Sequence, residues 1–230
     1  MTDTRTETTE NSLKQTCYID SDHQRIVAFI KPHINAGSSI RTAVNIFFVV
    51  RDEILYDPYH IRLDPSHMKA STILERGKGY CVAKAVLLAA CLRAAGIPAK
   101  LCFADVKNHI TTEKLKEAMQ TDVFYYHGYC LVYLDGNWVK ATPAFNLSLC
   151  EKFGIKPLDF NGRDDSIFHE YDTKGQRHME YIREHGCYDD LPLEEIVESF
   201  RTNYPGFREH FPIKEENSGP SFENEAEPIP

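Results

Sequence analysis

The chain has 230 residues, and its 42% hydrophobic and 26% charged residues are typical of a globular protein that can build a core. Its formal net charge of −8, from 26 Lys+Arg against 34 Asp+Glu, argues against a nucleic-acid partner gripped through its phosphates. It shows no apolar run of about 18 residues and no apolar segment near the N-terminus, so we expect neither a membrane span nor a secretory signal.

The seven cysteines are irregularly spaced, and none forms a Cys-x-x-Cys pair. This pattern predicts no disulfide framework and no four-cysteine zinc site, and it favours a reducing, cytoplasmic compartment. The ten histidines show no metal-binding spacing such as His-Glu-x-x-His, and the glycines show no nucleotide-binding pattern. We therefore expect no metal and no other cofactor.

Both ends of the chain are polar. Residues 1–16 lack apolar periodicity, and residues 212–230 carry four prolines and five glutamates against one lysine. Segments of this kind bury too little apolar surface to offset their ordering entropy, so we expect both to be disordered. The globular domain is then expected over residues 17–211.

Within the domain, the first half is expected to be helical. Apolar residues predict helices over residues 22–31, 38–55 and 71–75. The serines at 38 and 39 can cap the second of these helices. The next helix, over residues 81–95, has Lys84 and Arg93 as its only charges, so it is expected to be buried on most sides.

The second half is expected to supply the sheet. Residues 99–105 are predicted to form a strand and residues 111–120 a surface helix. Strands over 127–134 and 137–142 are joined by Asp135-Gly136, a strong hairpin signal. A last helix, capped by Asp190, is expected to end near Tyr204. This order is typical of an α+β fold, a buried helix on a small antiparallel sheet with flanking helices.

Cys81 is the first candidate for chemistry. It is expected in the first turn of the buried helix, directly after Gly77 and Gly79, where unpaired N–H groups and the helix dipole favour an anion. We therefore expect a lowered thiol pKa and donors for an oxyanion, with Lys84 adding positive charge if it faces the same way. The plain alternative is a cysteine that only packs at the start of a helix.

His127 is the candidate base. The two-residue turn places Tyr129 opposite Thr142, so His127 and Thr142 become diagonal neighbours on one face of the hairpin. Asn146 has the same parity, although Pro143 can end the strand before it. A helix-start cysteine, a histidine and a polar partner fit the pattern of nucleophile, base and orienting group.

These segments resemble the transglutaminase-like superfamily of papain-type cysteine enzymes over roughly residues 40–150. The likeness rests on GKGYCVAKAVLLAACLRAAGIPAK, which begins at Gly77, and on HGYCLVYLDGNWVKATPAFN, which begins at His127. Residues 158–204 resemble the C-terminal extension of bacterial members. The resemblance implies a papain-like core with Cys81 as nucleophile and His127 as base. In place of the family's aspartate this chain has Thr142, which can accept a hydrogen bond but carries no charge.

The leading hypothesis is a cysteine-dependent acyltransferase or amide hydrolase, acting on a peptide, a protein glutamine side chain or a small amide. Tyr80, Asn108 and His109 are further candidate substrate contacts. The second hypothesis is a catalytically inactive binding domain in which the missing aspartate marks lost activity. For the C-terminal tail, an alternative to disorder is that it folds back over the cleft as a built-in ligand anchored by Phe222.

Overall fold

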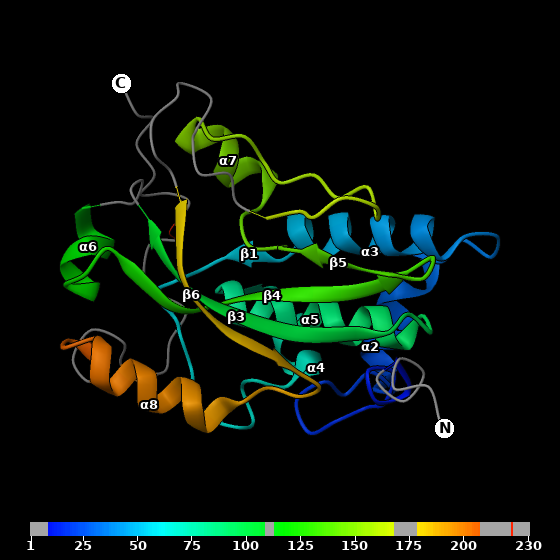
Figure 1. Cartoon of the computed structure of the whole chain (residues 1–230), viewed down its shortest axis with the longest axis horizontal. Helices are drawn as coiled ribbons and strands as arrows, with labels where there is room; N and C mark the ends of the chain where they lie inside the picture. Colours follow the sequence, from blue (N-terminus) through cyan, green and yellow to red (C-terminus); the bar gives the residue numbers. More distant parts are fainter. Residues whose placement is uncertain (1–8, 109–112, 168–178, 208–221, 223–230) are drawn as a thin grey trace.

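The computed structural model describes residues 9–108, 113–167, 179–207 and residue 222 (Figure 1). The helices are α2 Gln24–Ile30, a short 3-10 helix Lys31–His33, α3 Ser39–Glu53, α4 Ala70–Arg76, α5 Cys81–Ala94, α6 Glu113–Met119, α7 Leu147–Phe153 and α8 Leu193–Asn203. The strands are β1 Leu55–Tyr56, β2 Lys78–Gly79, β3 Ala99–Asn108, β4 Val123–Leu134, β5 Asn137–Ala141 and β6 Met179–Tyr188. The α+β fold is confirmed.

The main sheet has the strand order β5-β4-β3-β6, and its neighbouring strands are antiparallel. The β4–β5 hairpin has the predicted register, from Leu134 opposite Asn137 to Cys130 opposite Ala141. A separate two-stranded pair, β1 with β2, runs parallel and leads into α5. The sheet thus brings the start of β4 and the start of α5 into one region of the molecule.

Helix α5 is the centre of the core. Residues 81–93 are all buried, and Figure 1 shows the helix running along the sheet with α2, α3 and α4 around it. The sulfur of Cys130 on β4 donates to the carbonyl oxygen of Ala85 at 3.2 Å, so β4 lies directly against this helix. Burial on all sides matches the nearly uniform apolar sequence that predicted it.

Several helix ends follow the expected capping rules. The Ser38 hydroxyl accepts from the backbone N–H of Arg41 and caps α3. Helix α4 ends at Gly77, whose φ of 65° is favourable for glycine. Helix α8 ends at Asn203, next to the predicted Tyr204, but the predicted Asp190 cap was wrong. The first turn follows Pro192, whereas the Asp190 carboxylate accepts from the backbone N–H groups of Cys17 and Tyr18.

The N-terminal boundary also needs correction. Residues 9–16 are placed against the domain, because Ser12 is fully buried and its carbonyl accepts from the backbone N–H of Ala99 at 3.0 Å. The Arg93 guanidinium donates to the carbonyl of Lys14 at 2.6 Å. Buried backbone partners of this kind hold a polar segment that has no apolar periodicity of its own.

In the C-terminal tail, Phe222 is 4% exposed and therefore packed, which contradicts disorder at this residue. The expectations for residues 1–8, 208–221 and 223–230 lie outside the described residues.

A disulfide joins Cys102 on β3 to Cys187 on β6, two residues directly opposite each other in the sheet. The prediction of no disulfide was therefore wrong. Its cause is that strand β6 was not predicted, so no partner for Cys102 was visible in the sequence. The argument for a reducing compartment loses its basis with it. In the parts of the chain that the structure covers, no helix combines the length and apolar character that a bilayer crossing requires.

Candidate active site

Cys81 is the first residue of α5, as predicted, and Tyr80 is its N-cap. The preceding loop approaches the helix closely, since a Cβ on Gly79 would lie 2.8 Å from the Cβ of Ala83. The Cys81 side chain is 4% exposed. The thiol therefore lies at the start of a helix, as the sequence predicted, but it is buried inside the protein.

The surroundings of the sulfur act in two directions. Backbone N–H groups of Gly128, Val82 and Cys81 itself donate toward it and favour the thiolate. Burial has the larger effect and raises the pKa of the Cys81 thiol to about 11. The predicted lowering of this pKa is therefore wrong for the resting protein, in which Cys81 is a neutral thiol.

Gly128 fixes how closely β4 approaches the helix. A Cβ at this position would lie 2.8 Å from the Cα of Val82, so a side chain cannot fit without backbone movement. The ladder between β3 and β4 is shifted just before it, where Tyr126 adopts a φ of 54°. A bulge of this kind redirects the side chains that follow it. Together these features bring the chain at His127 to the start of α5.

His127 is 3% exposed, and burial lowers the pKa of its imidazole to about 4. Among the described residues, His127 does not contribute to the pKa shift of Cys81, and Cys81 does not contribute to the pKa shift of His127. At neutral pH the resting site thus holds a neutral thiol and a neutral imidazole rather than a thiolate–imidazolium pair.

Thr142 directly follows β5 and is 1% exposed. Its backbone N–H donates to the carbonyl of Ser166 at 3.0 Å. Its Oγ1 is buried and has no hydrogen-bond partner among the described residues. This hydroxyl therefore keeps its capacity to accept or donate one hydrogen bond.

Asn146 does not take the orienting role that was considered for it. Its carbonyl oxygen accepts from the backbone N–H of Tyr56 at 3.0 Å, and its amide nitrogen donates to the Ser148 hydroxyl at 2.8 Å. The side chain thereby ties α7 to β1. The expectation that Asn146 lies on the same face of the strand as Thr142 could not reveal these hydrogen-bond partners.

Tyr80 and Asn108 are both buried near the site. Tyr80 lines the pocket over Cys81, and its hydroxyl has no partner among the described residues. Asn108, at the end of β3, lines a neighbouring pocket. His109 lies outside the described residues.

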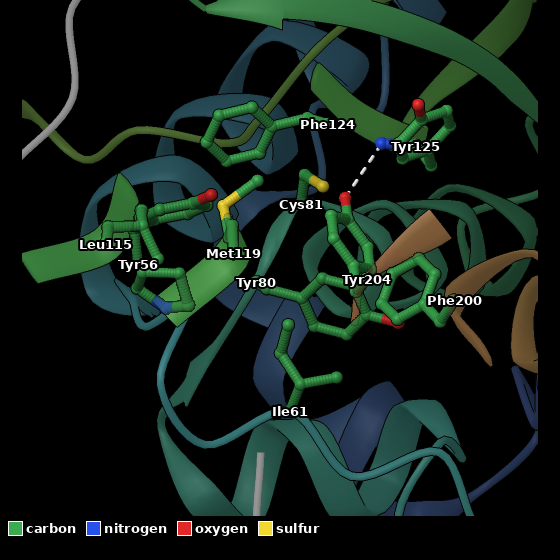
Figure 2. Close-up of a pocket in the computed structure, with 11 residues that line it drawn as sticks. Tyr56, Ile61, Tyr80, Cys81, Leu115, Met119, Phe124, Tyr125, Phe200 and Tyr204 are labelled. Atoms are coloured by element: carbon green, nitrogen blue, oxygen red, sulfur yellow. Dashed lines mark hydrogen bonds between the residues drawn. The ribbon is translucent and has the colours of Figure 1, made fainter. Parts of the chain in front are cut away.

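The pocket over Cys81 is small, and Figure 2 shows the residues that line it. Its volume of about 20 Å³ is room for roughly one water molecule. The lining side chains are mostly aromatic and apolar: Tyr56, Pro58, Ile61, Tyr80, Leu115, Met119, Phe124, Tyr125, Phe200 and Tyr204. A substrate can reach the sulfur only if part of this lining moves.

Tyr204, the residue after α8, is a site residue that sequence reasoning missed. Figure 2 shows its hydroxyl beside Cys81, where it accepts from the backbone N–H of Tyr125 at 2.8 Å. The same hydroxyl donates to the carbonyl of Val123 at 3.3 Å. The last helix thus covers the nucleophile, a relation that no local pattern in residues 190–204 could indicate.

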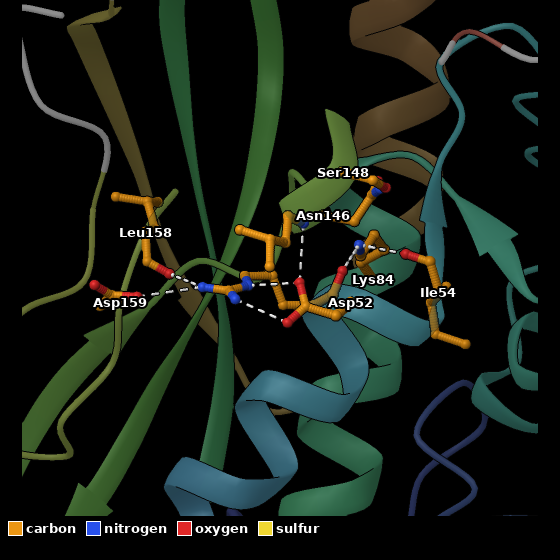
Figure 3. A network of polar contacts seen from close by, with 9 residues as sticks. Asp52, Ile54, Lys84, Asn146, Ser148, Leu158 and Asp159 are labelled. Carbon is orange, nitrogen blue, oxygen red and sulfur yellow. Dashed lines mark hydrogen bonds and ion pairs between the residues drawn. The ribbon is translucent and has the colours of Figure 1, made fainter. Parts of the chain in front are cut away.

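Lys84 also lies elsewhere than expected. Its ammonium group donates to the carbonyls of Arg51 and Ile54 at the end of α3, as Figure 3 shows for Ile54. Burial lowers its pKa to about 7. Lys84 therefore supplies hydrogen bonds to the last carbonyl groups of α3. Its charge does not contribute to the pKa of the Cys81 thiol.

In the ranges 9–108, 113–167 and 179–207, no three His, Cys, Asp or Glu side chains gather in a way that could hold an ion. The site is instead a buried cysteine at a helix start with a buried histidine on the adjoining strand.

Residues 30–143 match the family model of the transglutaminase-like superfamily, and this part of the chain is a domain of that superfamily. The matched segment contains Cys81, His127 and Thr142. No curated protein sequence matches the chain significantly.

Solved structures share parts of the fold at low similarity. A protein from Cytophaga hutchinsonii, provisionally assigned as a cysteine protease, is 17% identical to this chain with a TM-score of 0.45. The match covers 78% of this chain and 55% of the Cytophaga chain. The arylamine N-acetyltransferase of Nocardia farcinica is 16% identical with a TM-score of 0.40, covering 56% of this chain and 46% of its own. The chain thus spans about half the length of each of these structures.

Proposed function

We propose that the protein is a cysteine-dependent enzyme that transfers or hydrolyses an acyl group, with Cys81 as nucleophile and His127 as general base. The observation that carries the proposal is the placement of Cys81 at the N-terminus of α5, where backbone N–H groups of Gly128, Val82 and Cys81 itself favour the thiolate against the effect of burial. Such donors also stabilise the oxyanion of a tetrahedral intermediate. The superfamily match over residues 30–143 supports the same reading.

The reaction proceeds in two steps, acylation of Cys81 and transfer of the acyl group to water or an amine. In the first, the sulfur attacks the acyl carbon while His127 takes the thiol proton, and the scissile bond then breaks as His127 returns that proton to the leaving amine. In the second, water or an amine attacks the thioester and loses a proton to His127. That proton passes to the sulfur as the thioester bond breaks and frees Cys81.

The closed state constrains the first step. Because burial raises the pKa of the Cys81 thiol and lowers the pKa of the His127 imidazole, the thiolate–imidazolium pair is disfavoured in this state. The proton therefore moves as the sulfur attacks, or after the pocket opens and water reaches the site. Substrate binding has to supply this opening.

In this proposal Thr142 orients the imidazole of His127. Its Oγ1 is buried and lacks a partner among the described residues, so Thr142→Val keeps the shape of the side chain without breaking a described bond. We expect unchanged or slightly higher thermal stability and a roughly tenfold lower kcat. Thr142→Asp should keep or raise kcat, because a carboxylate stabilises the imidazolium.

The test measures kcat and melting temperature for both variants with glutamine peptides and small amides as acyl donors, in the presence and absence of an added amine. Faster turnover with the amine identifies a transferase, and equal rates identify a hydrolase. Unchanged kcat in Thr142→Val would remove Thr142 from the mechanism.

A catalytically inactive binding domain is the second candidate function. It is favoured by the pocket of about 20 Å³, which admits no substrate in the resting state. This candidate predicts ligand binding that is unaffected by Cys81→Ala and no turnover with any acyl donor.

A further inference from the structure

Phe222 is held in an aromatic cage. Its ring centroid lies 5.8 Å from that of Tyr56, 5.5 Å from Tyr59 and 5.6 Å from Phe153. The first two contacts are edge-to-face, and the third is stacked. These geometries suit the quadrupole of an aromatic ring and select it over an aliphatic group of equal size.

The pocket that Phe222 lines is built by distant parts of the chain. Besides Phe222, its lining side chains are Tyr56, Asn108, Leu115, Phe124, Phe145, Leu149, Phe153 and Ile155. Phe145 packs edge-to-face on Tyr56 at 4.8 Å, which fixes the ring that faces Phe222. The cage is therefore part of the folded domain.

This pocket adjoins the one over Cys81. Tyr56, Leu115 and Phe124 line both pockets, and Figure 2 shows them on the side of Cys81 away from Phe200. The charge of Cys81 also contributes to the raised pKa of the Tyr56 phenol, so that hydroxyl lies near the sulfur. The pocket beside the cage and the pocket over Cys81 therefore share part of their walls.

We propose that the cage is the subsite for an aromatic side chain of the acyl donor, and that Phe222 occupies it as an internal ligand until a substrate displaces it. The inference rests on the proposed function, since it assigns the position of the acyl donor relative to Cys81. A peptide whose aromatic side chain enters the cage would lie with its carbonyl toward the sulfur, across Tyr56.

An internal ligand lowers the apparent affinity for every competitor. A tethered group has an effective concentration on the order of millimolar, so it holds the pocket against a substrate of similar intrinsic affinity. Because the apparent dissociation constant rises as the free fraction of the pocket falls, removal of Phe222 should strengthen aromatic binding about tenfold.

The experiment measures binding rather than turnover. N-acetyl-L-phenylalaninamide and N-acetyl-L-alaninamide are titrated by NMR into full-length protein carrying Cys81→Ala, with and without Phe222→Ala. We expect the phenylalanine amide to bind about tenfold more tightly when Phe222 is replaced, and the alanine amide to bind weakly to both. Ile182→Ala serves as the control, because Ile182 is 55% exposed on β6 and should leave both affinities unchanged.

Two further variants keep the test decisive. If Phe222→Ala does not fold, Phe222→Leu retains an apolar group and should give a smaller gain in the same direction. Phe153→Trp narrows the cage and should abolish binding of the phenylalanine amide. Equal binding of the two amides to Phe222→Ala, or no gain over the chain with Phe222, would overturn the proposal.

The outcome also separates this inference from the proposed function. Selective binding of the phenylalanine amide without any acyl adduct on an intact Cys81 would support the subsite and contradict the enzyme. Acylation of Cys81 with no preference for aromatic donors would support the enzyme and contradict the subsite.

Discussion

At the residue scale, the site depends on one close contact between backbones. The distance of 2.8 Å from a Cβ on Gly128 to the Cα of Val82 leaves no room for a methyl group, and the obstacle is backbone rather than a flexible side chain. A glycine inside a strand is a known sign of such an approach. The sequence contained this signal beside His127.

Gly128→Ala should therefore push β4 away from the start of α5. We expect a loss of stability of about 1–3 kcal/mol and a kcat lowered by at least tenfold, measured by denaturant unfolding and steady-state kinetics. Gly37→Ala is the matched control, since the nearest atom to its Cβ is 3.7 Å away, and it should change neither quantity. A wild-type kcat in Gly128→Ala would contradict the role of this contact.

His127 makes stability depend on pH. Its pKa is about 4 in the folded protein and 6.5 as the ordinary value, so the unfolded state binds more protons between these two pH values. The contribution of His127 to the free energy of unfolding is fully present above pH 6.5 and is lost as the pH falls toward 4. The total loss is on the order of 3 kcal/mol.

The comparison of wild type with His127→Gln isolates this contribution, because other groups titrate alike in both proteins. The difference in unfolding free energy between the two should change across pH 4 to 6.5 and stay constant above it. A difference that is flat across this range would mean that His127 is not buried in its neutral form.

The residue scale also shows where sequence reasoning reached its limit. The motifs around Cys81, His127 and Thr142 predicted the helix start at Cys81 and the β4–β5 register correctly, and the assignment of these three residues as a catalytic triad stays a prediction. The pKa of Cys81 was misjudged because helix-start N–H groups are visible in the sequence, whereas burial by Phe200 and Tyr204 arises only from tertiary packing.

At the scale of elements, strongly periodic segments could be predicted and weakly patterned ones could not. Helix α5 and the β4–β5 register follow from a continuous apolar run and an Asp-Gly turn. Strand β6 lies at the edge of the sheet and has a single buried residue, Met179, and α7 has seven residues, so neither carries a clear period. The disulfide could not be predicted without β6.

The disulfide should add stability by shortening the unfolded chain. Cys102 and Cys187 are 85 residues apart, and closing a loop of this length stabilises by about 2–4 kcal/mol in typical proteins. Cys187→Ala should lower the unfolding free energy by that amount and make it insensitive to dithiothreitol. Cys17→Ser, at an exposed free thiol, should have no effect. Equal stability of wild type with and without reductant would show that the bond does not form.

At the scale of the whole molecule, the chain after the sheet closes the site. Phe200 and Tyr204 at the end of α8 cover Cys81, and Phe222 fills the adjoining cage. Because α8 and the tail follow the segment that matches the superfamily, access to the nucleophile is governed by a part of the chain outside that match.

Closure predicts a slow and pH-dependent thiol. With iodoacetamide, the exposed Cys17 should react first, and Cys81 should react at a rate that rises with pH toward its pKa of about 11. Peptide mass spectrometry of timed samples between pH 6 and 10, values chosen to span about four decades of thiolate fraction, resolves the two sites. Fast labelling of Cys81 at pH 6 would instead reveal a preformed thiolate and an open pocket.

The central claim is that Cys81 forms a thioester with an acyl donor. The most direct measurement is rapid acid quenching of the protein with an acyl donor, followed by intact-protein and peptide mass spectrometry. The account predicts one acyl group, located on Cys81, that is absent in Cys81→Ala and accumulates more slowly in His127→Gln. An adduct confined to Cys17, or none at any thiol under conditions in which the donor is bound, would contradict it.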